Sequence, residues 1–203
     1  MARLQYNQEK NLSIKEIHKP VVLMVDMVNG FTKEGALADP AILEIVSQQQ
    51  KMMDLLSCKN IFICDAHPPK TREFESYPSH CVIGTSQEEV ISELLPYVKQ
   101  VIKKNSTNAF MAPEFQTFLE EQMHWYEDII IMGCCSDLCI LQLALSLQAW
   151  ANEHNKTNHR IIVCTDGIET YHIDNVHDAC FWNQVAIDNM KTNGITVAKE
   201  IIE

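Results

Sequence analysis

Short runs of apolar and β-branched residues recur along this chain, separated by longer segments that have the periodicity of helices. A run that is apolar at consecutive positions, instead of at alternate ones, is typical of a strand buried on both faces of a sheet. The runs predict six strands, at 20–27, 60–67, 98–104, 128–135, 160–166 and 194–200. This pattern restricts the fold strongly, because strands buried on both faces need a covering layer on each side.

Helical patterns lie between these runs. The predicted helices are 40–57, 86–97, 113–124, 136–154 and 174–191. Strands that alternate with helices form βαβ units and a mostly parallel sheet. We therefore expect an α/β fold of three layers, with a mixed α+β domain as the alternative. The chain has 203 residues, no internal repeat and no Pro/Gly-rich linker, so a single domain over residues 1–203 is predicted.

The composition excludes several classes of partner. With 16 basic and 27 acidic residues the formal net charge is −11, so the field of the protein repels nucleic acids and anionic membranes. No apolar run approaches the roughly 18–20 residues that cross a bilayer, and residues 1–20 are too polar for a secretory signal. Eight cysteines without an export signal indicate reduced thiols. We expect a cytoplasmic protein that binds neither nucleic acid nor membranes.

Side chains that can carry chemistry stand at the ends of four predicted strands. The first strand ends at Asp26, the second at Asp65 and His67, and the third at a pair of lysines. The fourth runs into the segment GCCSDLC at 133–139. Ligands of parallel sheets bind beyond the carboxyl ends of the strands. The sequence therefore predicts that an acid, two metal-binding side chains, a lysine and a cysteine meet at one edge of the sheet.

The cysteine segment precedes the predicted helix that begins at residue 136. Ser136 or Asp137 can cap this helix, which puts Cys139 in the first turn. The positive end of the helix dipole stabilises a thiolate there, so Cys139 is a candidate nucleophile. The alternative is a small buried residue without reactivity. A zinc site formed by Cys134, Cys135 and Cys139 is less favoured, because adjacent cysteines seldom reach one tetrahedral ion.

A cysteine nucleophile needs a proton acceptor and a group that holds both in place. Asp26 can accept the proton if burial raises the pKa of its carboxyl group. A lysine at the end of the third strand, Lys103 or Lys104, can pair with Asp26 and stabilise developing negative charge. The alternatives are an acid that caps a turn and lysines that are solvated.

The end of the second strand predicts a metal site. Asp65 and His67 are two positions apart on extended chain, so both can face one side, and Glu73 and His80 follow in a long loop with Tyr77 beside them. Two imidazoles and two carboxylates suit zinc, manganese or iron. The alternative is that both histidines are surface residues of the loop.

The remaining histidines have no cluster of carboxylates or cysteines at ligand spacing. We interpret them as structural: His18, His124, His154, His159, His172 and His177.

The ordered set Asp26, Lys104 and Cys139 resembles the catalytic triad of the cysteine hydrolases of the isochorismatase superfamily. VDMVNGF resembles that family's strand-one aspartate, followed five residues later by an aromatic residue, here Phe31. KKNSTNAF resembles the lysine block, and the spacing to Phe110 selects Lys104 over Lys103. GCCSDLC resembles the nucleophile loop.

A fourth block, DAH…PSHCVIGT, resembles the nicotinamidase branch of the superfamily, in which the same motifs hold a metal. The resemblance implies that Asp65, His67 and His80 bind one divalent metal ion, with zinc favoured over manganese or iron. Glu73 stands where the branch commonly has a histidine, and it is the fourth expected ligand.

The resemblance also implies a Rossmann-like sheet of six strands and a deamidating hydrolase that converts nicotinamide to nicotinate and ammonia. Phe31 and Tyr77 match positions that would form walls for the pyridine ring. The Cys134–Cys135 peptide matches a cis bond, and the N–H groups of Cys135 and Cys139 would form the oxyanion hole.

The runner-up function is a cysteine hydrolase of the same fold that acts on another small-molecule amide. A hypothesis from a different class is a redox or metal-binding protein that uses the cysteines without hydrolysis. Only GCCSDLC supports it, and it leaves Asp26 and Lys104 without a role. Relatives are often oligomers, so a homo-oligomer is expected.

Overall fold

The computed structural model describes residues 9–203, so residues 1–8 of the predicted single domain lie outside the described residues. One sheet of six parallel strands forms the centre, in the order β4-β3-β2-β5-β6-β7. Its strands are β2 (Val21–Val25), β3 (Lys59–Asp65), β4 (Gln100–Lys104), β5 (Asp128–Cys134), β6 (Arg160–Glu169) and β7 (Thr196–Ala198). The predicted α/β class is confirmed, with every strand pair of this sheet parallel.

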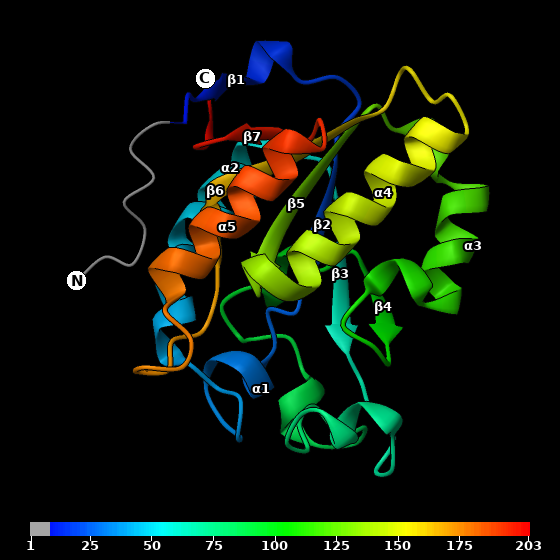
Figure 1. Cartoon of the computed structure of the whole chain (residues 1–203). Coiled ribbons are helices and arrows are strands. Elements are labelled where there is room, and N and C mark those ends of the chain that lie inside the picture. The colour runs from blue at the N-terminus through cyan, green and yellow to red at the C-terminus, as the bar shows by residue number, and fades with distance from the viewer. Residues whose placement is uncertain (1–8) are drawn as a thin grey trace.

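A second, two-stranded sheet joins the two ends of the described chain. β1 (Leu12–Ser13) pairs in parallel with β8 (Ile201–Ile202). Neither strand is visible in the sequence pattern, because two residues are too few to show a period. Figure 1 shows β1 and the C-terminus next to one another at one end of the molecule.

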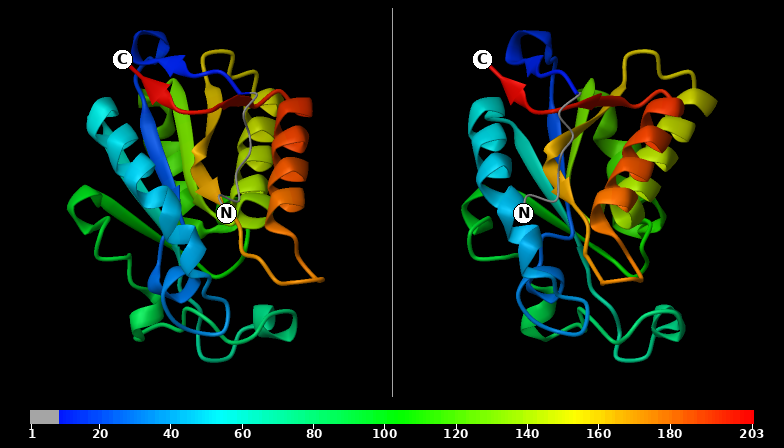
Figure 2. Two further views of the ribbon diagram at one scale, coloured as in Figure 1. Left: turned by 90° about the vertical axis from the view of Figure 1, so that its left-hand side faces the viewer. Right: turned by 60° about the vertical axis from the view of Figure 1, so that its left-hand side comes forward.

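Helices cover both faces of the six-stranded sheet, which gives three layers (Figure 2). One face is covered by α2 (Val46–Leu56), and the other by α3 (Pro113–Glu121), α4 (Leu141–Glu153) and α5 (Ala179–Thr192). A fifth helix, α1 (Asn29–Thr32), is one turn long. None of the helices in residues 9–203 has the length and apolarity needed to span a bilayer.

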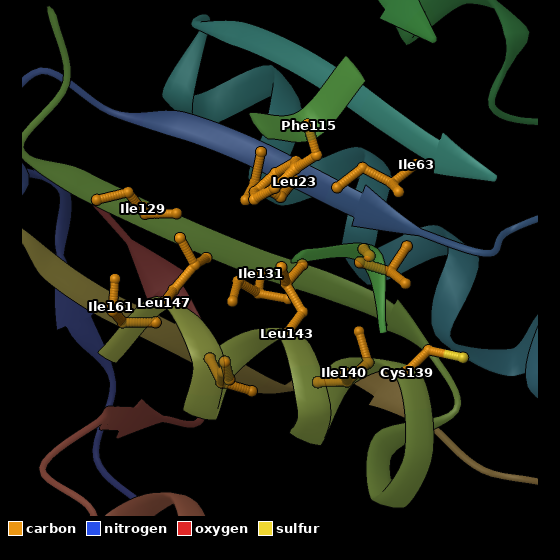
Figure 3. Close-up of a cluster of buried hydrophobic side chains, with 14 of the residues drawn as sticks. Leu23, Ile63, Phe115, Ile129, Ile131, Cys139, Ile140, Leu143, Leu147 and Ile161 are labelled. Atoms are coloured by element: carbon orange, nitrogen blue, oxygen red, sulfur yellow. The ribbon is translucent and has the colours of Figure 1, made fainter. Parts of the chain in front are cut away.

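Alternate residues of the central strands supply the two cores. In β2, Leu23 points to the core beneath α3 and α4, whereas Met24 points to the core beneath α2. Figure 3 shows Leu23 with Phe115 of α3 and Leu143 of α4, in the first of these cores. Every residue of β2 is buried, which accounts for its continuous apolar run.

The predicted helix at 86–97 is wrong. This segment contains only two 3₁₀ turns, Ser86–Glu88 and Leu95–Tyr97. Between them Val90 forms an isolated antiparallel bridge with Val28, after β2, with hydrogen bonds from Asn29 N to Glu89 O (3.0 Å) and from Ile91 N to Met27 O (3.1 Å), and residues 92–94 form a turn. Tertiary pairing of this stretch therefore overrides its helical pattern.

Other predicted helices have shifted ends. The helix predicted at 40–57 begins as a 3₁₀ turn, Pro40–Ile45, which Asp39 caps, and becomes α-helical at Val46. The helix predicted at 174–191 begins at Ala179, where the side chain of Asp178 accepts a hydrogen bond from Phe181 N.

The order of strands in the sheet reverses between β2 and β5. From β2 the chain continues outward to β3 and β4, and it returns to the other side of β2 for β5, β6 and β7. Such a switch point leaves a crevice beyond the carboxyl ends of the strands. At this point the backbone of Gly133 approaches Val25 so closely that a Cβ atom on Gly133 would lie 1.9 Å from Val25 O, and Gly133 has φ +127°.

We predict that Gly133→Ala destabilises the fold strongly, because a backbone clash cannot be relieved by a change of rotamer. The expected loss in the free energy of unfolding is roughly 3 kcal/mol or more, measured by urea denaturation. Gly84→Ala is the control: its φ is +83° but no atom lies within 4 Å of the added Cβ, so only the left-handed strain of about 1–2 kcal/mol is expected. Equal losses for the two variants would contradict the predicted clash.

Candidate active site

The predicted triad residues meet at the switch point. Asp26 follows β2, Lys104 ends β4, and Cys139 lies in the turn after β5. All three are at least 95% buried. Figure 3 shows Cys139 at the edge of the apolar cluster, with its sulfur pointing away from the other side chains.

Lys104 is the centre of this group. Its Nζ lies 2.8 Å from Asp26 Oδ2 and 2.6 Å from Asp65 Oδ1. It also lies 3.7 Å from Cys139 Sγ. The other oxygen of the Asp26 carboxylate accepts a hydrogen bond from the backbone N–H of Asp65 (2.9 Å). The structure therefore brings the triad together and joins it to Asp65, which the sequence associated only with the metal site.

The two carboxyl groups have opposite pKa shifts. Burial, and after it the charge of Asp65, raises the pKa of Asp26 to about 6, against the opposing effect of Lys104. Burial also acts to raise the pKa of Asp65, but the charge of Lys104 and the neighbouring imidazoles of His67 and His80 hold it well below its ordinary value. Asp65 is therefore a permanent anion, whereas Asp26 can exchange a proton near neutral pH.

The environment of Lys104 keeps its charge. Burial alone would lower the pKa of this ammonium group, but the carboxylates of Asp26 and Asp65 raise it well above its ordinary value. Lys103, the alternative in the sequence, points away: its side chain is 53% exposed and pairs with Glu88 at 2.8 Å. The alternation of β4 thus separates the two lysines.

The turn that carries Cys139 differs from the prediction. A π-helical turn, Ser136–Ile140, precedes α4, and its N-cap residue, Cys135, makes no capping bond with its side chain. Neither Ser136 nor Asp137 caps the helix, because their side chains bond Asn183 and the segment after β6 instead.

The expected stabilisation of a thiolate at Cys139 is not found either. Burial raises the pKa of the Cys139 thiol well above its ordinary value, although Lys104 opposes the shift. The thiol is therefore neutral at rest. Asp26 interacts with it directly and is the adjacent group able to take its proton.

The peptide bond between Cys134 and Cys135 is cis, as the resemblance implied. Cys134 donates its thiol hydrogen bond to the carbonyl oxygen of Asp26 (3.2 Å). Cys135 lines the same cavity as Cys139.

The four predicted metal ligands form one group. Asp65, His67, Glu73 and His80 each offer a ligand atom, and these atoms all lie within 4.8 Å of one another. His67 Nε2 lies 3.5 Å from Asp65 Oδ1 and 3.9 Å from Glu73 Oε1. His80 Nε2 lies 3.7 Å from Asp65 Oδ2. The alternative of two exposed loop histidines is wrong, because both are buried.

The histidines of this group are oriented as metal ligands are. His67 Nδ1 bonds the side-chain oxygen of Asn105 (2.7 Å), and His80 Nδ1 bonds the carbonyl oxygen of Pro78 (2.7 Å). These bonds fix the rings and leave each Nε2 directed at the carboxylates, which is the arrangement typical of bound metals. Among the described residues His67 Nε2 is buried without a hydrogen-bond partner. The donor set therefore fits a divalent cation.

A cavity of about 540 Å³ opens over Cys139 and this group. Phe31 and Tyr77 are among its lining residues, and their rings lie 5.4 Å and 6.3 Å from the ring of His80. Residues 36–39 and 171–173 also contribute to the lining, and the sequence did not indicate either segment.

Asn105 is another functional candidate that sequence reasoning missed. Its side chain bonds both His67 and Thr71. The position directly after Lys104, in a block already linked to the triad, was the signal that could have identified it.

Comparison with known proteins agrees with this geometry. The Isochorismatase domain profile matches residues 20–198. Nicotinamidase 1 of Arabidopsis thaliana is 22% identical over 192 residues, which cover 83% of this chain and 74% of that protein. The nicotinamidase of Acinetobacter baylyi is 26% identical over 170 residues, which cover 66% of this chain and 77% of that protein. The chain belongs to the isochorismatase family. Within it the chain is nicotinamidase-like, which confirms the predicted resemblance.

Solved structures show the same fold. PnC1 of L. infantum, in complex with nicotinate, superposes with a TM-score of 0.75 at 18% identity over 95% of this chain and 98% of that one. The pyrazinamidase of Pyrococcus horikoshii, in complex with zinc, superposes with a TM-score of 0.71 at 19% identity, over 90% of this chain and 99% of that one. The N-carbamoylsarcosine amidase of Thermoplasma acidophilum has a TM-score of 0.69 at 25% identity, over 90% of this chain and 96% of that one.

We predict that Lys104→Met destabilises the protein by about 3–5 kcal/mol at neutral pH, because it leaves two buried carboxylates without their counter-ion. Urea denaturation measures the loss. Lys103→Met is the matched control one residue away; it removes only a partly exposed ion pair and should cost no more than about 1 kcal/mol. If Lys103→Met were as costly as Lys104→Met, the assignment of the buried lysine would be wrong.

Proposed function

We propose that this protein is a metal-dependent amidase that hydrolyses nicotinamide to nicotinate and ammonia through a thioester on Cys139. Its family membership makes it a hydrolase acting on amide bonds. One observation carries the finer proposal: Cys139, the Asp26–Lys104 pair and the group of four potential metal ligands all border one cavity or lie directly behind it. A nucleophile, a proton acceptor and a site that can orient a ring are thus within reach of one small substrate.

The first half of the reaction forms the thioester. Asp26 takes the proton of the Cys139 thiol, and the sulfur attacks the carboxamide carbon. Because its pKa is raised to about 6, Asp26 is ionised at neutral pH and yet basic enough to accept a proton. Asp26 then gives the same proton to the departing nitrogen, so that the C–N bond breaks and ammonia leaves.

The second half regenerates the enzyme. Asp26 takes a proton from water, the hydroxide adds to the thioester carbon, and the C–S bond breaks to release nicotinate. The Cys139 sulfur recovers its proton from Asp26. In both halves the backbone N–H groups of Cys135 and Cys139 stabilise the oxyanion, an effect worth roughly 3–4 kcal/mol per donor in other enzymes. Lys104 holds Asp26 in place and stabilises the negative charge that develops during the reaction.

Asp65, His67, His80 and Glu73 would hold the metal ion. When bound, a divalent cation supplies a Lewis-acidic anchor for a ring nitrogen. Phe31 and Tyr77 flank this group and would contact the faces of the pyridine ring. The zinc-bound structure from Pyrococcus horikoshii supports zinc as the ion.

A second candidate function is hydrolysis of another small amide by the same residues. The likeness to N-carbamoylsarcosine amidase, an enzyme of the same fold, favours keeping this candidate. The redox alternative has little support: Cys134, Cys135 and Cys139 of the nucleophile turn form no disulfide, and only the amidase gives Asp26 and Lys104 a role.

We predict that the purified protein releases ammonia from nicotinamide and that Cys139→Ala lowers the rate by about a thousandfold or more. The nucleophile is lost, whereas the fold should persist because alanine fills most of the same space. Cys58→Ala is the control, since this half-buried cysteine lies at the opposite end of β3 and should leave the rate unchanged. Substantial turnover by Cys139→Ala would remove the thioester from the proposal. Faster turnover of a ureido or carbamoyl amide than of nicotinamide would favour the second candidate.

We predict that the protein binds one divalent metal ion per chain, counted by elemental analysis of the protein as purified. His80→Ala should abolish the stoichiometric metal. His172→Ala should keep it, because His172 also lines the cavity but lies outside the group of four. Removal of the metal with a chelator should raise KM for nicotinamide strongly. A protein free of metal and fully active on nicotinamide would contradict the assignment.

A further inference from the structure

His177 is buried beside the nucleophile turn, and both of its ring nitrogens face acceptors. Nδ1 lies 2.9 Å from the carbonyl oxygen of Tyr171, and Nε2 lies 2.8 Å from Asp137 Oδ2. A carbonyl oxygen accepts only, so Nδ1 carries a proton. Nε2 is at hydrogen-bond distance from a carboxylate oxygen, and a hydrogen bond to a carboxylate is stronger than one between neutral groups.

The partner of this bond belongs to the turn that presents Cys139. Asp137 is two residues before Cys139 in the π-helical turn, and Leu138 between them lines the cavity. The other Asp137 oxygen accepts from Thr170 Oγ1 (2.5 Å). Both oxygens of this side chain are thus held by the segment that follows β6.

A separate set of bonds secures the same turn from α5. Ser136 bonds the side chain of Asn183, and Asn183 Nδ2 donates to Glu169 Oε1 (2.5 Å). Loss of the His177 bond therefore leaves the turn attached at its first residue. The expected consequence is a displaced nucleophile and not an unfolded protein.

The ring of His177 also fixes one wall of the cavity. It stacks on Tyr171, with centroids 3.9 Å apart and planes inclined by 14°, and on Trp182, at 5.5 Å and 9°. Tyr171 lines the cavity together with its neighbours His172 and Ile173. One side chain thus contacts both the nucleophile turn and the substrate wall.

We propose that His177 is a positioning residue of this amidase: its Nε2 holds the Cys139 turn through Asp137, and its Nδ1 and ring hold the Tyr171 wall. The inference rests on the proposed function. It assigns to His177 a part in the rate of the chemical step and a separate part in the binding of substrate.

Two amide substitutions separate these parts. In His177→Gln the side-chain N–H₂ group can occupy the place of Nε2 and bond Asp137, and the bond to Tyr171 is lost. In His177→Asn the shorter amide can occupy the place of Nδ1 and bond the Tyr171 carbonyl, and the bond to Asp137 is lost. His177→Leu removes both.

For the hydrolysis of nicotinamide we expect His177→Gln to keep kcat within about twofold and to raise KM. We expect His177→Asn to lower kcat about tenfold or more, the range expected for one hydrogen bond to a charged group. Both variants lose the stacked ring, so both should raise KM, but His177→Asn should raise it less because it keeps the bond to Tyr171. A role confined to stability would lower Tm and leave both constants unchanged in the folded variants. Equal kinetic effects of Gln and Asn would overturn the proposal, whether or not His177→Leu folds.

A measurement without substrate separates this inference from the proposed function. The rate at which iodoacetamide modifies Cys139, followed by mass spectrometry of its peptide, should match the wild type in His177→Gln and fall about fivefold or more in His177→Asn. Cys58, at the far end of the sheet, is the internal reference. An unchanged rate at Cys139 in His177→Asn would overturn the proposal even if nicotinamide is hydrolysed. A fall in that rate would support it even if the wild type hydrolyses no amide.

Discussion

The buried ammonium group of Lys104 holds two carboxylates of different character next to one thiol. Its contacts with Asp26 and Asp65, at 2.8 and 2.6 Å, supply the counter-ion that two buried carboxylates need. Asp65 contacts two histidines and remains an anion, whereas Asp26 is mainly subject to burial and has a raised pKa. When the environments of two titratable groups shift their pKa values in opposite directions, the two groups can take different roles. Here the division gives one carboxylate to proton transfer and the other to the metal group.

The topology of the sheet makes this cluster possible. Asp26, Asp65, Lys104 and Cys139 are far apart in the sequence but follow four strands whose carboxyl ends lie at the same edge. The reversal of strand order between β2 and β5 opens a crevice at that edge. Loops after the strands then close the crevice into a cavity, and the segment after β6 supplies its far wall. The sheet thus fixes the positions of the reacting groups, while the loops determine the shape of the cavity and which molecules can bind in it.

Much of this arrangement could be predicted from the sequence. The apolar runs located the six central strands, and the signal is most continuous for β2, β3 and β5, whose residues are buried on both faces of the sheet. Residues at strand ends, such as Asp26 and Lys104, followed from the strands, and the alternation of β4 separates Lys104 from Lys103. The family motifs supplied the metal group, whose four members prove to be neighbours.

The rest depended on contacts that no local pattern encodes. The helix expected at 86–97 gave way to pairing with residues 27–29, which lie far away in the sequence. The caps expected from Ser136 and Asp137 were absent because both side chains found partners on other elements. The sequence also gives no sign of the contacts of His177 with Asp137 and Tyr171, because nothing at ligand spacing surrounds this histidine along the chain. The sequence placed Asp65 in the metal group alone, whereas in the structure Asp65 also pairs with Lys104. This contact joins residues 39 positions apart, so no local pattern shows it.

The thioester on Cys139 is the central claim, and it can be observed directly. Protein mixed with nicotinamide is quenched with acid during steady turnover, digested, and the peptide that contains Cys139 is weighed by mass spectrometry. The account predicts a nicotinoyl group on Cys139 and on no other cysteine, lost after treatment with hydroxylamine. Release of ammonia from nicotinamide while the Cys139 thiol stays unmodified throughout turnover would contradict it.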